Sequence, residues 1–145
     1  MRRALTVLAI LGAIAATPGR PAEDLPVAFR TLDVYMDPLG APLAAWQVEV
    51  ACRDGEGRIA GVEGGEDHRY AGAPWYDPAA LQAGRIIIGA FSLDEGTPSG
   101  RTRVARLHLI EAGGPGRYDA RVMAAAAEGG RRIEAKVDLV PAGGN

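Results

Sequence analysis

From residue 28 onward the sequence consists of short runs in which apolar and polar residues alternate, and Gly, Pro and Asp separate these runs. Alternation with a period of two is typical of a β-strand that buries one face, because successive side chains of a strand point to opposite sides. Apolar residues at helical spacing do not continue beyond about two turns in this region. The pattern therefore predicts an all-β domain.

The clearest strand is expected over residues 43–53, where alternate positions are apolar. Trp46 lies on this apolar face and is expected in the core. The other residues of the face are Val48, Val50 and Cys52. Further strands are expected at 29–36, 59–63, 85–91, 103–111, 118–128 and 133–140. About seven strands separated by turns favour an antiparallel two-sheet β-sandwich, of the jelly-roll or immunoglobulin-like kind.

Two segments depart from simple alternation. Gly129-Gly130 joins the last two expected strands and is typical of a two-residue hairpin turn. The alanines at 124–127 would also suit a helix, but the alternation around them favours the end of a strand. The stretch 64–84 is irregular, and it is expected to hold a short extra strand or a helical turn near 78–82.

The N-terminus has the pattern of a secretory signal peptide. Arg2 and Arg3 precede an uncharged apolar run at 4–16, and Thr17-Pro18-Gly19 interrupts it. The run is about thirteen residues long, whereas a membrane-spanning helix needs roughly 20. A cleaved leader is therefore predicted, and an uncleaved anchor is the alternative. The mature protein is expected to be secreted, periplasmic or held in the cell envelope.

These patterns divide the chain into four parts. Residues 1–21 are expected to form the signal peptide and the start of a linker, and residues 22–27 the rest of that linker. Residues 28–141 are expected to form one β-domain, and residues 142–145 a disordered tail. Chains of this length suit a single domain. No membrane span is expected in the mature chain.

Charge argues against a nucleic-acid partner. The whole chain has 16 basic and 18 acidic residues, a formal charge of −2. Without Arg2, Arg3 and Arg20, the mature part would hold 13 basic residues against 18 acidic ones, a formal charge of −5. Binding to nucleic acid requires a basic patch or stripe, which this sequence lacks.

Residue types that bind metals are scarce. Cys52 is the only cysteine, so no internal disulfide can form, and an intermolecular disulfide is the alternative to a buried apolar role. The two histidines, His68 and His108, cannot complete a zinc site with one cysteine. No cofactor is expected. Calcium remains an alternative at the acidic loops 54–57 and 94–96, although turn formation explains both loops.

Catalytic motifs are also missing from the sequence. Ser92 and Ser99 are the only serines, and neither lies in the Gly-x-Ser-x-Gly motif of a nucleophile elbow. The chain is therefore predicted not to be an enzyme. A secreted hydrolase is the third alternative for function, because paired carboxylates can meet in space without a local motif.

Three aromatic residues gather in the irregular stretch: Tyr70, Trp75 and Tyr76. Exposed rings can stack on sugar faces or anchor a protein partner, so all three are candidate binding residues. The alternative is that Trp75 or Tyr76 folds back and closes an open end of the β-domain.

The order of several sequence pieces resembles a cohesin-type domain, of the carbohydrate-binding-module-like β-sandwich group. The resemblance covers about residues 30–140. Gly55 follows Asp54 where the family usually has Pro, and the 64–84 loop is longer and more aromatic than is typical. The matching pieces are 32–36, 42–50, Asp54, 59–65, 85–91 and 104–109.

This resemblance implies non-catalytic recognition. Cohesins bind dockerin modules through one sheet face, and relatives of the fold bind polysaccharides. The first expectation is therefore a dockerin-like or envelope protein as partner, bound on a sheet face that includes Arg106 and His108. Such a face should expose apolar residues among charges, for which Val104, Ile110 and Met123 are candidates. The second expectation is a polysaccharide, bound by the loop of Tyr70, Trp75 and Tyr76.

Overall fold

The computed structural model describes residues 25–143. The predicted signal peptide at 1–21, linker residues 22–24 and the last two residues of the chain lie outside the described residues. The strands of the described part are β1 (Val27–Asp37), β2 (Ala45–Gly64), β3 (Trp75–Tyr76), β4 (Arg85–Phe91), β5 (Thr102–Ala126) and β6 (Lys136–Ala142). Its 3-10 helices are η1 (His68–Tyr70), η2 (Pro78–Ala80) and η3 (Glu128–Gly130).

The six strands form one antiparallel sheet in the order β3-β4-β2-β5-β1-β6. The prediction of an all-β antiparallel fold is therefore confirmed. β2 and β5 have 20 and 25 residues, and most strands have only about 5–6. These two strands pair from Ala45 opposite Ala126 to Gly64 opposite Ala105. They form the centre of the sheet.

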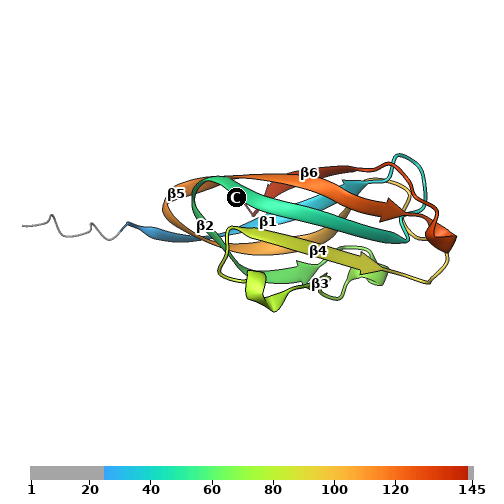
Figure 1. Ribbon diagram of the computed structural model, residues 1–145, viewed down its shortest axis with the longest axis horizontal. Helices are drawn as coiled ribbons and strands as arrows, with labels where there is room; N and C mark the ends of the chain where they lie inside the picture. The colour runs from blue at the N-terminus through green and yellow to red at the C-terminus, as the bar shows by residue number, and fades with distance from the viewer. Residues whose placement is uncertain (1–24, 144–145) are drawn as a thin grey trace, which may run out of the picture.

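β2 and β5 both turn back on themselves at one end of the molecule (Figure 1). At this bend Gly55 of β2 lies across from residues 113–116 of β5, which form no pairs with β2. Gly55 and Gly114 have φ angles of 88° and 124°, in the left-handed region that glycine adopts without steric cost. The three additional residues give β5 the longer path that it needs to follow β2 around the bend.

A buried carboxylate supports the bend from inside. Glu111 is 1% exposed. Its side chain accepts a hydrogen bond of 2.9 Å from the backbone N–H of Gly116 and one of 3.1 Å from Arg30 Nη1. A buried charge is tolerated only when it is paired and hydrogen-bonded. Glu111 thereby links β1 to the additional residues of β5.

The folded sheet encloses one hydrophobic core. Alternate residues of every long strand contribute to it, including Trp46 as predicted. Both halves of β2 and β5 supply buried side chains, so the two halves of the sheet face each other across this core. The largest apolar side chains that are fully buried are Val34, Met36, Leu43, Val48, Val50, Ile59, Ile86, Ile88, Val104, Leu107 and Leu109.

The expected boundaries at the bend were wrong. Residues 43–53 and 59–63 were expected as two strands, but residues 45–53 and 59–63 both belong to β2. Residues 103–111 and 118–128 were likewise expected as two strands, but most of them belong to β5. The glycines bend the backbone there, while pairing between β2 and β5 resumes on the other side. For the same reason the division into two separate sheets is not confirmed.

β6 pairs with β1 and not with the strand that precedes it. Gly129 and Gly130 do form a turn, both with positive φ, but only Ala126 and Arg132 pair across it. β6 then crosses to the other half of the sheet and covers the free edge of β1. The stretch 64–84 contains a two-residue strand and 3-10 turns at 68–70 and 78–80, in agreement with the expectation.

The bend generates a first testable prediction. A Cβ added at Gly57 would collide with the phenol oxygen of Tyr118 and approach Cys52 Sγ to 3.2 Å. Gly57→Ala is therefore expected to lower the free energy of unfolding by about 1–3 kcal/mol. Denaturation in urea measures this change.

Gly72→Ala is the matched control, because an added Cβ there meets nothing within 4 Å. The loss of unfolding free energy caused by Gly57→Ala should also be smaller in a protein that carries Tyr118→Phe, because this protein lacks the colliding oxygen. If the loss is equal with Tyr118 and with Phe at this position, the collision is not its cause.

Candidate functional site

The folded sheet has two outer faces, one on each half. The β1 face is the outer side of β1, β6, residues 56–64 of β2 and residues 102–112 of β5. The β4 face is the outer side of β3, β4, residues 45–53 of β2 and residues 117–126 of β5. The structure places the predicted residues Arg106 and His108 on the β1 face and Trp75 on the β4 face.

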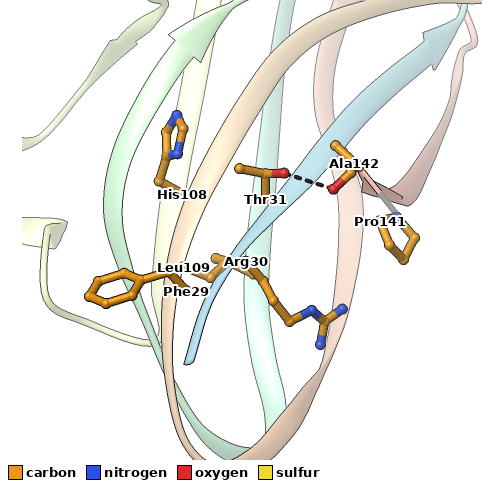
Figure 2. Close-up of a pocket in the computed structure, with 8 residues that line it drawn as sticks. Phe29, Arg30, Thr31, His108, Leu109, Pro141 and Ala142 are labelled. Atoms are coloured by element: carbon orange, nitrogen blue, oxygen red, sulfur yellow. Dashed lines mark hydrogen bonds between the residues drawn. The ribbon is translucent and has the colours of Figure 1, made fainter. Parts of the chain in front are cut away.

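The β1 face carries a pocket of about 350 Å³ between β1, β5 and the end of β6. Figure 2 shows Phe29 and His108 on one side of it and Pro141 and Ala142 on the other. Thr31 lies between them, and its hydroxyl donates a hydrogen bond of 2.9 Å to the carbonyl oxygen of Ala142. Phe29 is 78% exposed, so its ring stands free beside the pocket.

Cross-strand ion pairs cover the centre of the β1 face. The guanidinium of Arg106 donates two hydrogen bonds to Asp33, of 2.6 and 3.0 Å. These bonds raise the pKa of Arg106 above its ordinary value. His108 Nε2 lies 2.8 Å from Glu63 Oε1. Both predicted residues thus have partners within the fold, yet about a third or more of each side chain is exposed.

The β4 face carries a shallow apolar hollow of about 410 Å³. Trp75 and Phe91 border it and are 69% and 73% exposed. Its floor consists of residues with little or no side chain, which keeps the surface low between the rings. These floor residues are Ala45, Gly89, Ala124 and Ala126.

Tyr70 and Tyr76 do not join Trp75 on this surface, and the expectation of a three-ring binding loop is corrected. Tyr70 is 2% exposed and its ring meets Trp46 edge-on at 6.1 Å. Its hydroxyl donates a hydrogen bond to the carbonyl oxygen of Leu43. Tyr76 follows Trp75 in the same strand, so it points to the opposite side and packs against the core. Trp75 itself is not folded back.

A charged cluster lies on the β4 face beyond the hollow. Glu49 is 5% exposed because Arg121 and Arg85 lie over its carboxylate from the two neighbouring strands. The hydrogen bond from Arg121 lowers the pKa of Glu49, and burial of the carboxylate opposes this shift only in part. Arg53 and Asp119 form a further ion pair at this end of the face, with 2.8 Å between Arg53 Nε and Asp119 Oδ2.

Buried carboxylates in residues 25–143 are each held by arginine. Asp33, Glu49 and Glu111 pair with Arg106, Arg121 and Arg30, respectively. These pairs link neighbouring strands. This arrangement suits a structural role.

The described part of the chain contains no group of three or more His, Cys, Asp or Glu residues that could hold a metal ion. At the first candidate calcium loop, Asp54 Oδ1 accepts a hydrogen bond of 3.0 Å from the N–H of Gly55. At the second, the N–H of Asp94 donates to Ser92 Oγ over 3.1 Å. Both contacts are those of turns. Cys52 is a half-buried thiol, and its Sγ lies 3.2 Å from the carbonyl oxygen of Asp54.

The apolar residues named for a binding face have different positions. Val104 was expected at the surface, but it is 0% exposed and belongs to the core. It was misplaced because Val104 and Ala105 are both buried, which breaks strict alternation next to a register shift in β1. Ile110 and Met123 are half-buried.

Two exposed rings that dominate the surface were missed in the sequence. Phe29 and Phe91 each lie at an end of an expected strand, and an apolar residue there is usually assigned to the core. The spacing along each strand could have identified them, because residues an odd number of positions apart in a strand point to opposite faces. Phe29 is three residues from the inward-facing Leu32, and Phe91 is three residues from the inward-facing Ile88.

Comparisons with protein-family models, with curated proteins and with solved structures found no match. Among residues 25–143 no helix is long and apolar enough to cross a membrane.

Tyr70 generates the second testable prediction. Burial raises the pKa of Tyr70 to about 12, from an ordinary value of about 10. Above pH 10 the unfolded chain therefore loses a proton that the folded protein keeps. We expect the free energy of unfolding to fall between about pH 10 and 12, by up to about 1.4 kcal/mol per pH unit for this group.

Tyr70→Phe should remove part of this fall in the free energy of unfolding at alkaline pH. At neutral pH the same substitution should cost about 1–3 kcal/mol, because the Leu43 carbonyl loses its donor. Denaturation in urea across the pH range measures both effects. Some decline should persist, because burial raises the pKa of Tyr118 as well. If the free energy of unfolding of Tyr70→Phe falls above pH 10 as steeply as that of the wild type, Tyr70 is not a source of this fall.

Proposed function

We propose that this chain is a secreted or envelope-located, non-catalytic recognition module with a cohesin-like β-sandwich, and that it binds a protein partner through its β1 face. Two halves of a sheet around one core support the sandwich. The partner class is a dockerin-like module or another envelope protein. This proposal keeps Arg106 and His108 in the binding surface and adds Phe29, beside the pocket, as its anchor.

The single observation that carries the proposal is the exposure of Phe29. A phenylalanine ring that is 78% exposed has lost the stabilisation that burial of its apolar surface would give. Exposed aromatic side chains beside a pocket are typical anchors of protein interfaces. Val140 and half-buried Ile110 lie on the same face, so apolar side chains are scattered among the ion pairs as a protein-binding face requires.

The charged side chains of the β1 face are held in place by partners within the fold, which suits the recognition of a partner protein. Arg106 is held by Asp33, and His108 by Glu63, so both are oriented before a partner arrives. Arg101 lies 4.0 Å from the centre of the Tyr35 ring and 3.5 Å from Asp138. Preordered side chains lose little conformational freedom on binding. They also set partner choice through charge complementarity.

Carbohydrate binding is the second candidate, and the exposure of Trp75 favours it. The ring is 69% exposed beside an open hollow, where it could stack on a sugar. Gln47 is the one polar side chain that lines this hollow. Sugar recognition also needs hydrogen-bonding groups around the ring. For this reason protein recognition is the better-supported function.

The third testable prediction addresses the β1 face. The chain is immobilised through its C-terminus and exposed to extracellular and envelope extracts of the source organism. The retained protein is then identified by mass spectrometry and purified, and its dissociation constant is measured by calorimetry. Phe29→Ala is expected to weaken binding by at least about tenfold, because truncation of an interface anchor costs about 2 kcal/mol or more.

Phe91→Ala is the matched control, since it removes an equally exposed ring from the other outer face. It should leave the dissociation constant unchanged. Equal binding by wild type and Phe29→Ala would contradict the proposal. Recovery of a glycan that Trp75→Ala no longer retains would move the function to carbohydrate binding.

A further inference from the structure

The first four residues of β1 have a neighbouring strand on one side only, within the described part of the chain. β1 pairs with β5 from Val27 onward. On its other side, pairing with β6 begins only at Thr31, opposite Ala142. Gly143 then has a φ angle of 73°, outside the range of a β-strand, so β6 does not continue along β1. We call residues 27–30 of β1 the open edge.

The register shows which backbone groups the open edge presents. The carbonyl oxygen of Pro26 accepts a hydrogen bond of 3.1 Å from the N–H of Gly113 in β5. In an antiparallel ladder, successive residues direct their N–H and C=O groups alternately to the two neighbouring strands. Pro26 faces β5, so Val27 and Phe29 direct theirs to the opposite side. These groups are available to another strand.

The pocket of the β1 face occupies the place where a further strand would lie. Its lining includes Phe29 and His108, which point to the outer side of the sheet, and Leu109, which points into the core. Pro141 and Ala142, at the end of β6, line its other side (Figure 2). A cavity that is lined from both faces of a sheet and by the end of a strand is a gap within the sheet itself.

The exposed side chains along this part of β1 are apolar. Leu25, Val27 and Phe29 are 48%, 59% and 78% exposed. They occupy alternate positions, so they lie on the same outer side of the sheet. Val27 and Phe29 therefore offer both unpaired backbone groups and apolar contacts. An extended segment with apolar residues at alternate positions matches both features, because its side chains and backbone groups repeat with the same period.

β6, the strand at the end of the sheet, differs from the open edge. It carries Lys136, Asp138 and Pro141. Charged side chains and proline are the devices that protect an edge strand from pairing with another chain. The open edge has one charged residue, Arg30, and its guanidinium is held by Glu111. The edge that lacks protection is thus the one beside the pocket.

A second copy of this chain cannot occupy the open edge, because β6 lies beside β1 from Thr31 onward. If two open edges paired as antiparallel strands, the residues that precede Val27 in each copy would run into β6 of the other. If they paired as parallel strands, the two β6 strands would meet. The occupant is therefore a segment of another protein.

We propose that the partner of the β1 face contributes an extended segment with apolar residues at alternate positions, and that this segment pairs with residues 27–30 as an additional strand in line with β6. The backbone groups of Val27 and Phe29 form its hydrogen bonds, and its apolar side chains lie beside these two residues on the outer side of the sheet. This inference rests on the proposed function and specifies how the partner is held.

The fourth testable prediction uses a peptide as the probe. A fluorescein-labelled peptide of sequence Lys-Thr-Val-Thr-Val-Thr-Lys is titrated with the full chain, and binding is measured by fluorescence anisotropy. We expect saturable binding. Methylation of the two valine amide nitrogens should weaken it by about tenfold or more, because these N–H groups face β1. Methylation of the threonine amide between the valines is the matched control, since that N–H faces away, and it should have little effect.

A variant of the protein tests the same hydrogen bonds from the other side. Val27→Pro removes an N–H that faces the gap and places the proline ring there, but it leaves the pairing of β1 with β5 intact. It should weaken binding of the peptide by about tenfold or more. Val27→Ala is the matched control, because it also removes the branched side chain but keeps the N–H. Thermal unfolding of both variants shows whether the fold is kept.

Amide hydrogen exchange, measured by NMR, tests the open edge directly. In the free protein the amides of Val27 and Phe29 should exchange faster than those of Ala28 and Arg30, which face β5. Saturation with the peptide should slow exchange at Val27 and Phe29. Rapid exchange at Val27 and Phe29 that persists in the saturated complex would overturn the proposal, even if Val27→Pro fails to fold.

Strand addition and the proposed function fail in different ways. A wild type that does not bind the peptide at millimolar concentration excludes strand addition, and so does equal binding by Val27→Pro and Val27→Ala. A captured partner that needs Phe29 but binds these two variants equally keeps the proposed function and excludes strand addition. If that partner does not need Phe29 while the peptide needs the N–H of Val27, the proposed function fails and strand addition stands.

Discussion

The pairing of β2 with β5 on both sides of the bend is the constraint on which the rest of the structure depends. These two strands pair on both sides of the bend, so the half of the sheet that carries β4 and the half that carries β1 belong to one sheet. The bend works because Gly55 and residues 113–116 let the two backbones turn by different path lengths. Without this pairing the two halves would not enclose a common core, and neither outer face would exist in its present form.

Arginine–carboxylate pairs between neighbouring strands give the two outer faces their different character. On the β1 face Arg106 and Asp33 link β5 to β1, and the remaining surface alternates between ion pairs and single apolar side chains. On the β4 face the charges gather at one end around Glu49, and small residues leave a hollow between two rings. A face with scattered anchors suits a partner protein.

The residues of the candidate surfaces could be predicted only in part. His108 and Arg106 lie on the polar side of an alternating run, and parity alone placed them on an outer face. Tyr70 could not be placed in this way. It lies in an irregular segment without a period, and its burial depends on Leu43 and Trp46, which are distant in the sequence. The hollow was equally hidden, because Ala45, Gly89 and Ala124 come together only when three strands pair.

Alternation by itself determined that the chain is antiparallel β and that Trp46, Val48 and Leu107 face a core, because the twofold period of a strand is a local property of the backbone. The tertiary structure alone decided that the expected strands on either side of Gly55 form one long β2. It also decided that β6 pairs with β1. Glycine permits either a tight turn or a bend within a strand, and pairing with the neighbouring strand selects between them. That pairing joins residues far apart in the chain, so no local pattern records it.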